Sequence, residues 1–382
     1  MSEWKKVKLG EICNIKSGKR LPKGCDFSDI PTKYKYIRAR DIKNGIINGE
    51  ELAYISEETQ HKISKYIVNS DDIVITIVGA SVGDVAYVSS LYNGVNLTEN
   101  AVRLTQFNED VNSRYLFYIL NSPNYYQLMQ RIAGGAAQPK MGIYKVEAIE
   151  VYLPSFPTQT RIATILSRYD SLIENYQKQI KLLEESAQRL YKEWFIDLRF
   201  PGHENTKIVD GVPEGWEKKS VTDVLEIKYG KDHKLLKDGT NPVYGTGGVM
   251  RYVEKSLCTG ESVLIPRKGS LNNILLVDGT FWTIDTMFYS IPKEDNVAKI
   301  VYFYLKGVDM YSFNIGAAVP SMTVNILSGM KLLIPKDDIR KEFEKIVSIY
   351  FIRVQSLQSQ INHLSEARDR LLPKLMSGEI EV

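Results

Sequence analysis

Two stretches of the chain repeat apolar residues at alternating spacings of three and four. Such sustained heptads predict two long helices, residues 156–198 and 337–378, that pair in a coiled coil. Only Arg368 interrupts the second stripe, and its aliphatic stem can cover apolar surface. In the first helix the stripe is Ile162, Leu166, Tyr169, Ile173, Tyr176, Ile180, Leu183, Ala187, Leu190 and Trp194. In the second it is Phe343, Val347, Tyr350, Val354, Leu357, Ile361, Leu364, Arg368, Leu371 and Leu375.

These stripes cannot remain in water, because burying each large apolar side chain contributes about 1.5–3 kcal/mol. Antiparallel packing of the two helices against each other is the simplest arrangement that covers both. The alternative is that each stripe is ordinary core for a neighbouring partner helix, and free helix faces can dock partners in either case.

The remaining chain has the pattern of two globular regions, 1–155 and 216–336, joined to the helices by a linker at 199–215 that is rich in Gly and Pro. Short β-type runs punctuated by Gly, Asn and Asp predict strands in both regions. They lie near 72–78, 85–88, 149–153, 262–265, 273–277 and 331–334. Helices are expected near 113–132, capped by Asn112, and near 297–306.

Residues of the first half return in the second half. The segment 136–141 (Ala-Ala-Gln-Pro-Lys-Met) recurs at 317–322 as Ala-Ala-Val-Pro-Ser-Met, while Trp4 and Gly18 recur as Trp216 and Gly230. The fold predicted is therefore α+β, with two mixed α/β domains separated by the two long helices and an internal pseudo-two-fold repeat. A duplicated reader on a duplicated spacer suits a ligand with two similar halves, of which duplex DNA is the commonest.

Charge is unevenly distributed, although the net charge is only +3. Residues 1–40 carry eleven Lys/Arg against four Asp/Glu, and residues 228–268 carry eight against four. A basic surface on each globular region would meet phosphates, although solvated surface lysines are the plainer explanation. The three cysteines and four histidines lack metal-ligand spacing, and no apolar run is long enough to span a membrane.

Glycine-bounded basic loops are the first candidates for nucleic-acid contact, because they let backbone and cations approach a phosphate. The alternative is a turn with solvated lysines. In the first region the candidates are Lys16, Lys19, Arg20 and Lys23, and in the second they are Lys231, His233, Lys234, Arg251, Arg267 and Lys268.

Two further segments carry residue types that read base edges. Residues 36–42 predict a strand with Arg38 and Arg40 on one face by the period of two, although Arg40 is nearly as well suited to a structural pair with an aspartate. Gln138 and Lys140, in the repeated Gly-rich loop, suit adenine and phosphate or guanine, whereas the second copy has Val319 and Ser321. If this loop reads bases, the two halves read different ones; the alternative is that it only sets a turn.

A short match to a catalytic motif is judged a coincidence. Residues 241–244 (Asn-Pro-Val-Tyr) are near the Asn-Pro-Pro-Tyr/Phe motif of enzymes that methylate base amino groups. The second proline is replaced, no methyl-donor motif accompanies it, and the equivalent region near 34–37 lacks it. No catalytic residue and no metal ligand is therefore assigned.

Taken together, the residues resemble the specificity subunits of type I restriction-modification systems over the whole chain. The resemblance rests on Trp4 with 9–12, on 36–38, 135–141, 153–162 and 212–216, and on the ending Leu-Leu-Pro-Lys-Leu-Met-Ser-Gly-Glu-Ile at 371–380. It implies that two target-recognition domains each read half of a bipartite, asymmetric DNA site while an antiparallel coiled coil sets the gap between the half-sites.

The resemblance also implies partners: two methyltransferase subunits, to which motor-nuclease subunits attach. The three cysteines, odd in number, are typical of reduced thiols and predict a cytoplasmic location. The resemblance implies no cofactor in this chain, with methyl donor, ATP and Mg²⁺ bound by the partners. The competing hypotheses are a degenerate DNA adenine methyltransferase, which would bind methyl donor by itself, and a coiled-coil adaptor, which would show no salt-sensitive DNA binding.

Overall fold

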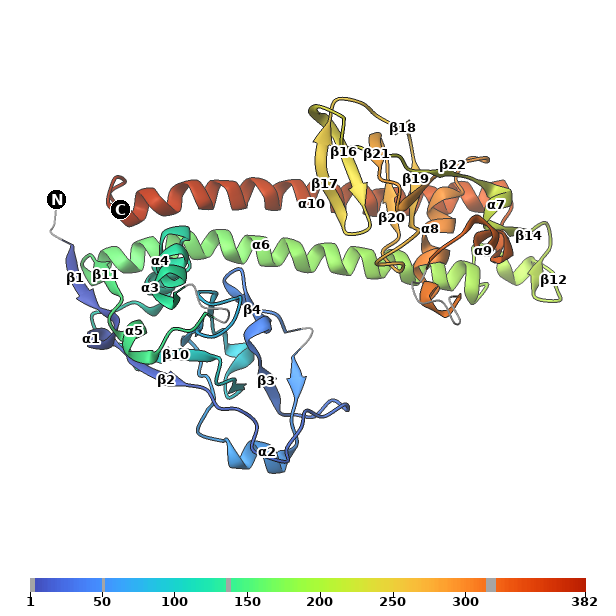
Figure 1. The fold of residues 1–382 in the computed structure, drawn as a ribbon. Helices are drawn as coiled ribbons and strands as arrows, with labels where there is room; N and C mark the ends of the chain where they lie inside the picture. Colours follow the sequence, from blue (N-terminus) through green and yellow to red (C-terminus); the bar gives the residue numbers. More distant parts are fainter. Residues whose placement is uncertain (1–3, 50–51, 135–138, 314–320) are drawn as a thin grey trace. The chain divides into compact units, whose positions relative to one another are not determined.

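The computed structural model describes residues 4–49, 52–134, 139–313 and 321–382. The chain divides into two compact units, Met1–Glu174 with Ile361–Val382, and Asn175–Gln360. Each unit contains a globular domain together with one segment of each long helix, α6 (Phe156–Tyr191) and α10 (Asp337–Ser377) (Figure 1). A π-helical turn, Lys192–Ile196, continues α6. Among the described residues, no helix is long and apolar enough to cross a membrane.

The first unit is built on an antiparallel sheet in the order β2-β10-β7-β8, with β1 and β11 forming a separate ribbon. A smaller sheet, β6-β3-β9, contains a parallel pair, β3 and β9. The strands of the first unit are β1 (Lys5–Lys8), β2 (Asn14–Ser17), β3 (Lys35–Ile37), β4 (Ile42–Lys43), β5 (Ile46–Ile47), β6 (Ala53–Tyr54), β7 (Ile73–Thr76), β8 (Val85–Tyr87), β9 (Asn96–Leu97), β10 (Ala101–Thr105) and β11 (Glu150–Leu153). Its helices are α1 (Leu9–Ile12), α2 (Glu57–Lys62), α3 (Ser113–Leu120), α4 (Pro123–Ala133) and α5 (Ile143–Glu147), with 3-10 turns at Ala39–Asp41 and Ser90–Tyr92.

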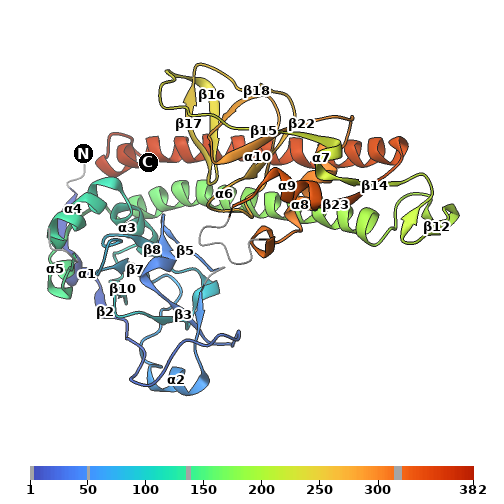
Figure 2. The same cartoon turned by 45° about the vertical axis from the view of Figure 1, so that its right-hand side comes forward.

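The continuous apolar run of β7 reflects burial on both faces of the sheet. Ile73 and Ile75 join a core that also includes Leu116 of α3 and Ile162 of α6, so α3 lies between the sheet and α6 (Figure 2). Val74, which points the other way, joins a second core with Ile37. A strand covered on both sides needs no polar alternation, which explains its sequence.

The second unit repeats this framework in the order β15-β22-β19-β20, with the ribbon β14–β23 and a parallel pair, β16 and β21. Its strands are β12 (Ile208–Val209), β13 (Val212–Pro213), β14 (Glu217–Ser220), β15 (Leu225–Tyr229), β16 (Asp238–Gly245), β17 (Gly248–Val253), β18 (Cys258–Thr259), β19 (Ser262–Pro266), β20 (Leu275–Val277), β21 (Thr280–Thr283), β22 (Met287–Pro292) and β23 (Lys331–Ile334). Its helices are α7 (Val221–Val224), α8 (Ala298–Lys306) and α9 (Val324–Gly329), with 3-10 turns at His203–Asn205 and Met310–Phe313. The predicted internal repeat is thus confirmed in the four-stranded sheet, the ribbon and the parallel pair.

The long helices are antiparallel within each unit. In the first unit Leu166, early in α6, shares a core with Leu371 and Leu375 near the end of α10. In the second unit Trp194, just after α6, packs on Phe343 near the start of α10 with ring centroids 5.8 Å apart. Every position of both predicted heptad stripes is buried or half-buried. The paired helices expected from the stripes are confirmed.

Arg368, the residue that interrupts the stripe, belongs to an ion-pair network. It donates to Asp170 of α6 at 2.9 Å, and Asp170 also accepts a hydrogen bond from the Tyr118 hydroxyl of α3. Arg114, one turn earlier in α3, lies 3.9 Å from the same carboxylate and stacks on Tyr87 of β8. The network joins the sheet, α3 and both long helices through one carboxylate.

The second unit places a buried cation in a comparable position. Lys299 of α8 is only 8% exposed and pairs with Glu261 and with Glu344 of α10, the latter at 2.5 Å. Because an unpaired carboxylate is costly to bury, the lysine is essential to a site that already holds two acids.

Two expectations about local structure are wrong. The helix expected over 113–132 is split into α3 and α4, because Pro123 lacks an N–H and disfavours helical backbone at the residue before it. The strand expected over 36–42 ends at Ile37, and residues 39–41 form a 3-10 turn. The cap at Asn112 is confirmed, since its side chain accepts from the Tyr115 N–H at 3.0 Å.

We predict that Lys299→Met destabilises the protein by about 3 kcal/mol at pH 7, because it leaves two half-buried carboxylates without their cation. Burial raises the pKa of Glu261, and Lys299 opposes that rise. In the variant the pKa rises further, so the folded state binds its proton more tightly than the unfolded state, and stability is regained as the pH falls toward 5. Urea unfolding at both pH values measures this. Lys345→Met, at an exposed position of α10, is the control; equal effects of both variants would contradict the prediction.

Candidate nucleic-acid interface

In the second unit, basic side chains gather where β15 and β19 end and β22 begins. The Gly230 N–H donates to the Met287 carbonyl at 3.0 Å, and the Lys231 N–H donates to the Thr283 carbonyl at 2.8 Å. The Arg267 guanidinium lies over the Tyr229 ring at 4.7 Å and donates to the Asp285 carbonyl. Lys231, Arg267 and Lys268 therefore share one edge of the sheet.

The first unit forms the same edge with the same backbone contacts. The Gly18 N–H donates to the Ala101 carbonyl at 3.1 Å, and the Lys19 N–H donates to the Leu97 carbonyl at 2.8 Å. Arg20, next in the loop, is exposed and paired with Glu99 at 2.8 Å. Lys16 on β2 and Lys23 beyond the loop are also exposed. We call these two matching edges, with their loops, the basic edges.

The repeated glycines have a packing role that the sequence analysis did not assign. A Cβ on Gly18 would lie 2.1 Å from the Thr98 carbonyl oxygen, and one on Gly230 would lie 2.0 Å from the Ile284 carbonyl oxygen. The loop crosses the end of the small sheet so closely that only glycine fits. The glycines thus hold the basic loops in place, while the cations beside them face solvent.

Arg38 and Arg40 differ in environment. Arg38 donates to both oxygens of Asp41, each at 2.9 Å, and that carboxylate is only 2% exposed. Arg40 has a side chain that is 69% exposed and lies 4.0 Å from the same aspartate. The structural pair with aspartate, which the sequence analysis weighed for Arg40, is therefore made by Arg38, and Arg40 is the one presented to solvent.

The other candidates of the second unit lie near the hairpin β16–β17. Lys234 is exposed beside half-buried His233, and Arg251 of β17 pairs with Asp238 at 2.6 Å. The exposed apolar side chains of β17, Val249, Met250 and Tyr252, were not predicted. An edge strand with both faces partly exposed does not alternate apolar and polar residues, so the sequence offered little indication that these side chains would be exposed.

The repeated Pro-x-Met loop lies at the same basic edges. Lys140 is exposed and forms a bridge with Val78, directly beyond β7, and half-exposed Ser321 forms one with Lys268, directly beyond β19. Gln138 lies outside the described residues.

The Asn-Pro-Val-Tyr segment is structural. It lies in β16, where the Asn241 amide donates to the carbonyls of Val253 and Glu254 at 3.3 and 3.2 Å, and Val243 is fully buried. The described residues also contain no group of histidines, cysteines and acids placed to hold a metal ion.

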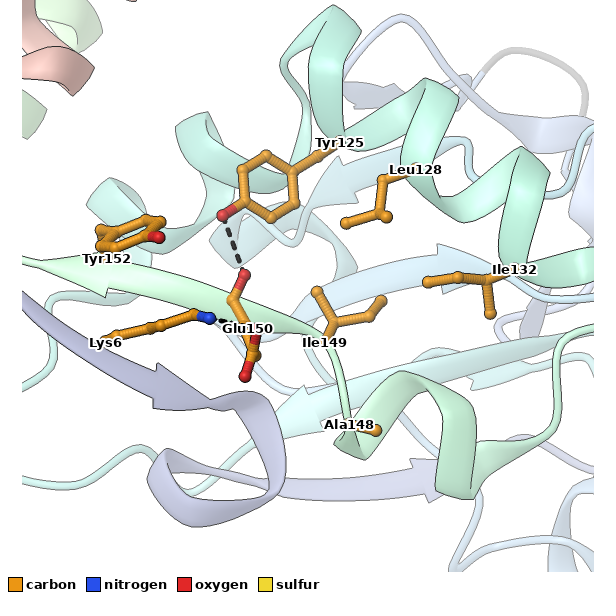
Figure 3. Close-up of a pocket in the computed structure, with 8 residues that line it drawn as sticks. All are labelled: Lys6, Tyr125, Leu128, Ile132, Ala148, Ile149, Glu150 and Tyr152. Atoms are coloured by element: carbon orange, nitrogen blue, oxygen red, sulfur yellow. Dashed lines mark hydrogen bonds and ion pairs between the residues drawn. The ribbon is translucent and has the colours of Figure 1, made fainter.

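A cavity of about 330 Å³ lies elsewhere on the first unit, between α4 and the ribbon β1–β11 (Figure 3). Its floor is apolar, with Leu128, Ile132 and Ile149, and an ion pair between Lys6 and Glu150 crosses its rim at 2.7 Å. The Tyr125 hydroxyl donates to the Glu150 carbonyl at 2.9 Å, and burial raises the pKa of Tyr125 to about 12. None of the candidate nucleic-acid contacts lines it.

The fold is thus a duplicated α+β framework that carries one basic edge in each unit. The family described as "Type I restriction modification DNA specificity domain" matches residues 1–185 and 213–366, and the chain belongs to this family.

Similar proteins agree over the full length. The MjaIX specificity subunit of Methanocaldococcus jannaschii is 27% identical, covering 99% of this chain and 93% of the relative, and the HindI specificity subunit of Haemophilus influenzae is 21% identical, covering 100% of both. The crystal structure of the type I restriction-modification S subunit from M. genitalium has the same fold, with a TM-score of 0.65 at 18% identity over 98% of this chain and 96% of that one.

We predict that Gly230→Ala lowers the free energy of unfolding by about 1–3 kcal/mol, because the added methyl group overlaps a backbone carbonyl that cannot move freely. Gly247→Ala is a matched control, since a Cβ there has no neighbour within 4 Å. Thermal and urea unfolding of both variants measure the difference, and similar midpoints would show that the close approach does not matter.

Proposed function

We propose that this chain is the non-catalytic DNA-reading subunit of a type I restriction-modification complex in the cytoplasm. Each domain reads one half of a bipartite site, and the paired helices fix the separation of the half-sites. The observation that carries the proposal is the duplication of the basic edge on the same sheet framework in both units. The family to which the chain belongs supports it.

The reading residues fall into two groups. Lys16, Lys19, Lys23, Lys140, Lys231, Lys234 and Lys268 are exposed cations suited to phosphates, and Arg40 is suited to base edges. Arg20, Arg38, Arg251 and Arg267 already have protein partners, so we propose that they shape the edges. His233, Ser321 and Gln138 remain candidates for contacts beside them.

Methyltransferase subunits, with motor-nuclease subunits attached through them, are the proposed partners, in keeping with the names of the similar proteins as type I restriction enzyme subunits. Exposed apolar side chains on the helices, such as Leu182 and Ile352, offer contacts for them. We propose that methyl donor, ATP and Mg²⁺ bind to these partners and that this chain needs none of them.

The test is a methylation map of host DNA from cells that express the chain with the methyltransferase subunit encoded beside it. The expected result is a new bipartite motif with a fixed gap. A complex that assembles and yields no new methylated motif would contradict the proposal and favour an adaptor role.

We predict that inserting one heptad after Glu174 and another after Gln360 changes the gap in the methylated motif and leaves both half-sites unchanged, because the readers stay intact while both helices lengthen equally. An insertion in one helix alone misaligns the stripes and should abolish assembly. Altered half-site bases with the same gap would refute the prediction.

A further inference from the structure

Two isolated β-bridges, each a single backbone pairing of two residues, lie at the basic edges and occupy equivalent places in the repeat. Beyond β7, the Met141 N–H donates to the Ile77 carbonyl at 2.9 Å, and Val78 is bridged to Lys140. Beyond β19, the Met322 N–H donates to the Arg267 carbonyl at 2.9 Å, and Lys268 is bridged to Ser321.

Strand registers confirm the equivalence independently. Thr76 lies opposite Ala101, whose carbonyl accepts from the N–H of Gly18, directly after β2. Pro266 lies opposite Met287, whose carbonyl accepts from the N–H of Gly230, directly after β15. Counting two residues on from Thr76 and from Pro266 leads to Val78 and to Lys268.

Each bridge therefore contains one lysine, but on opposite strands. In the first unit the lysine is in the Pro-x-Met loop (Lys140), and in the second it follows the central strand (Lys268). Both lysines are exposed, and no ion pair of either one occurs among the described residues. Directly opposed residues of an antiparallel pair have Cβ atoms about 4.5–5.5 Å apart on the same face. A flexible lysine stem spans that distance, so an ammonium group starting from either strand reaches the same place.

We infer that this cross-strand position is a phosphate contact used in both half-sites, with its lysine supplied by Lys140 in the first domain and by Lys268 in the second. The inference rests on the proposed DNA-reading function. The lysine charge occupies the same position in both domains although it comes from opposite strands. It must therefore contact a part of the ligand that is the same in both half-sites. In DNA of unlike half-sites that part is the phosphodiester backbone, for which lysine is a suitable point charge.

The neighbouring positions differ between the domains. Ile77 of the first domain corresponds to Arg267 of the second, and the loops that follow share their first glycine, Gly79 and Gly269, and then differ in sequence. The shared lysine would fix the register of each domain on the duplex while these neighbours differ.

The experiment uses the complex of this chain with its methyltransferase subunits and two 30-base-pair duplexes, one carrying the mapped motif and one scrambled. Affinity is measured by fluorescence anisotropy at several salt concentrations for Lys140→Ala, Lys268→Ala and the exchanged variants Val78→Lys/Lys140→Ser and Lys268→Val/Ser321→Lys. Lys65→Ala, another exposed lysine, is the control.

Each single alanine variant should weaken binding to both duplexes about fivefold at 0.15 M salt and reduce the slope of log K against log salt by about 0.9, the effect of one phosphate contact. The exchanged variants should bind with the affinity and slope of the natural protein, and the methylated motif should be unchanged in all.

Loss of affinity in the exchanged variants equal to that of the alanine variants would overturn the inference, as would a changed base in the motif, since the lysine would then read sequence. Unfolding midpoints show whether each variant is folded. A natural complex without salt-sensitive DNA binding would instead reject the proposed function, and the inference with it.

Discussion

The burial of two apolar stripes is the constraint on which this structure depends. Both α6 and α10 carry an apolar stripe, and every position of each stripe is buried or half-buried. In each unit the cover comes from the other long helix and from the core of the adjoining domain, where Ile162 joins β7 and Phe343 joins the aromatic cluster around Tyr191. A domain and its two helix segments therefore form one core, which ties the reading surface to the spacer mechanically.

Within this constraint the two domains keep a common framework and vary what it carries. The sheet order, the ribbon beside it and the glycine loop at the basic edge are the same in both units. One difference is an insertion: residues 38–52 separate β3 from β6 in the first domain, where the second has the tight turn from β16 to β17. Helix α4 has no α-helical counterpart among the described residues of the second unit. Fixed strands that position variable loops suit a protein whose ligand changes while its assembly does not.

Much of the architecture could be predicted because it depends on local periodicity. The heptads located α6 and α10, and the repeat identified the equivalent strands. Features that depend on contacts between residues distant in sequence could not be predicted. Arg368 donates to Asp170, which lies 198 residues earlier in the chain, and Lys268 lies opposite Ser321 only in the folded protein. Pro123 gave a local signal that the apolar periodicity on both sides masked. The basic candidates could be identified from the sequence. Whether Arg38 or Arg40 pairs with Asp41 could not, because it depends on β3 ending at Ile37.

The central claim is that each domain carries its own half of the specificity on a shared framework. The most direct measurement is the methylation map of a chimera in which residues 5–153 are replaced by residues 217–334, joined at equivalent positions of the ribbons β1–β11 and β14–β23. The account predicts a motif in which the second half-site replaces the first and the original second half-site is retained. An unchanged motif, or one altered in both half-sites, would contradict it.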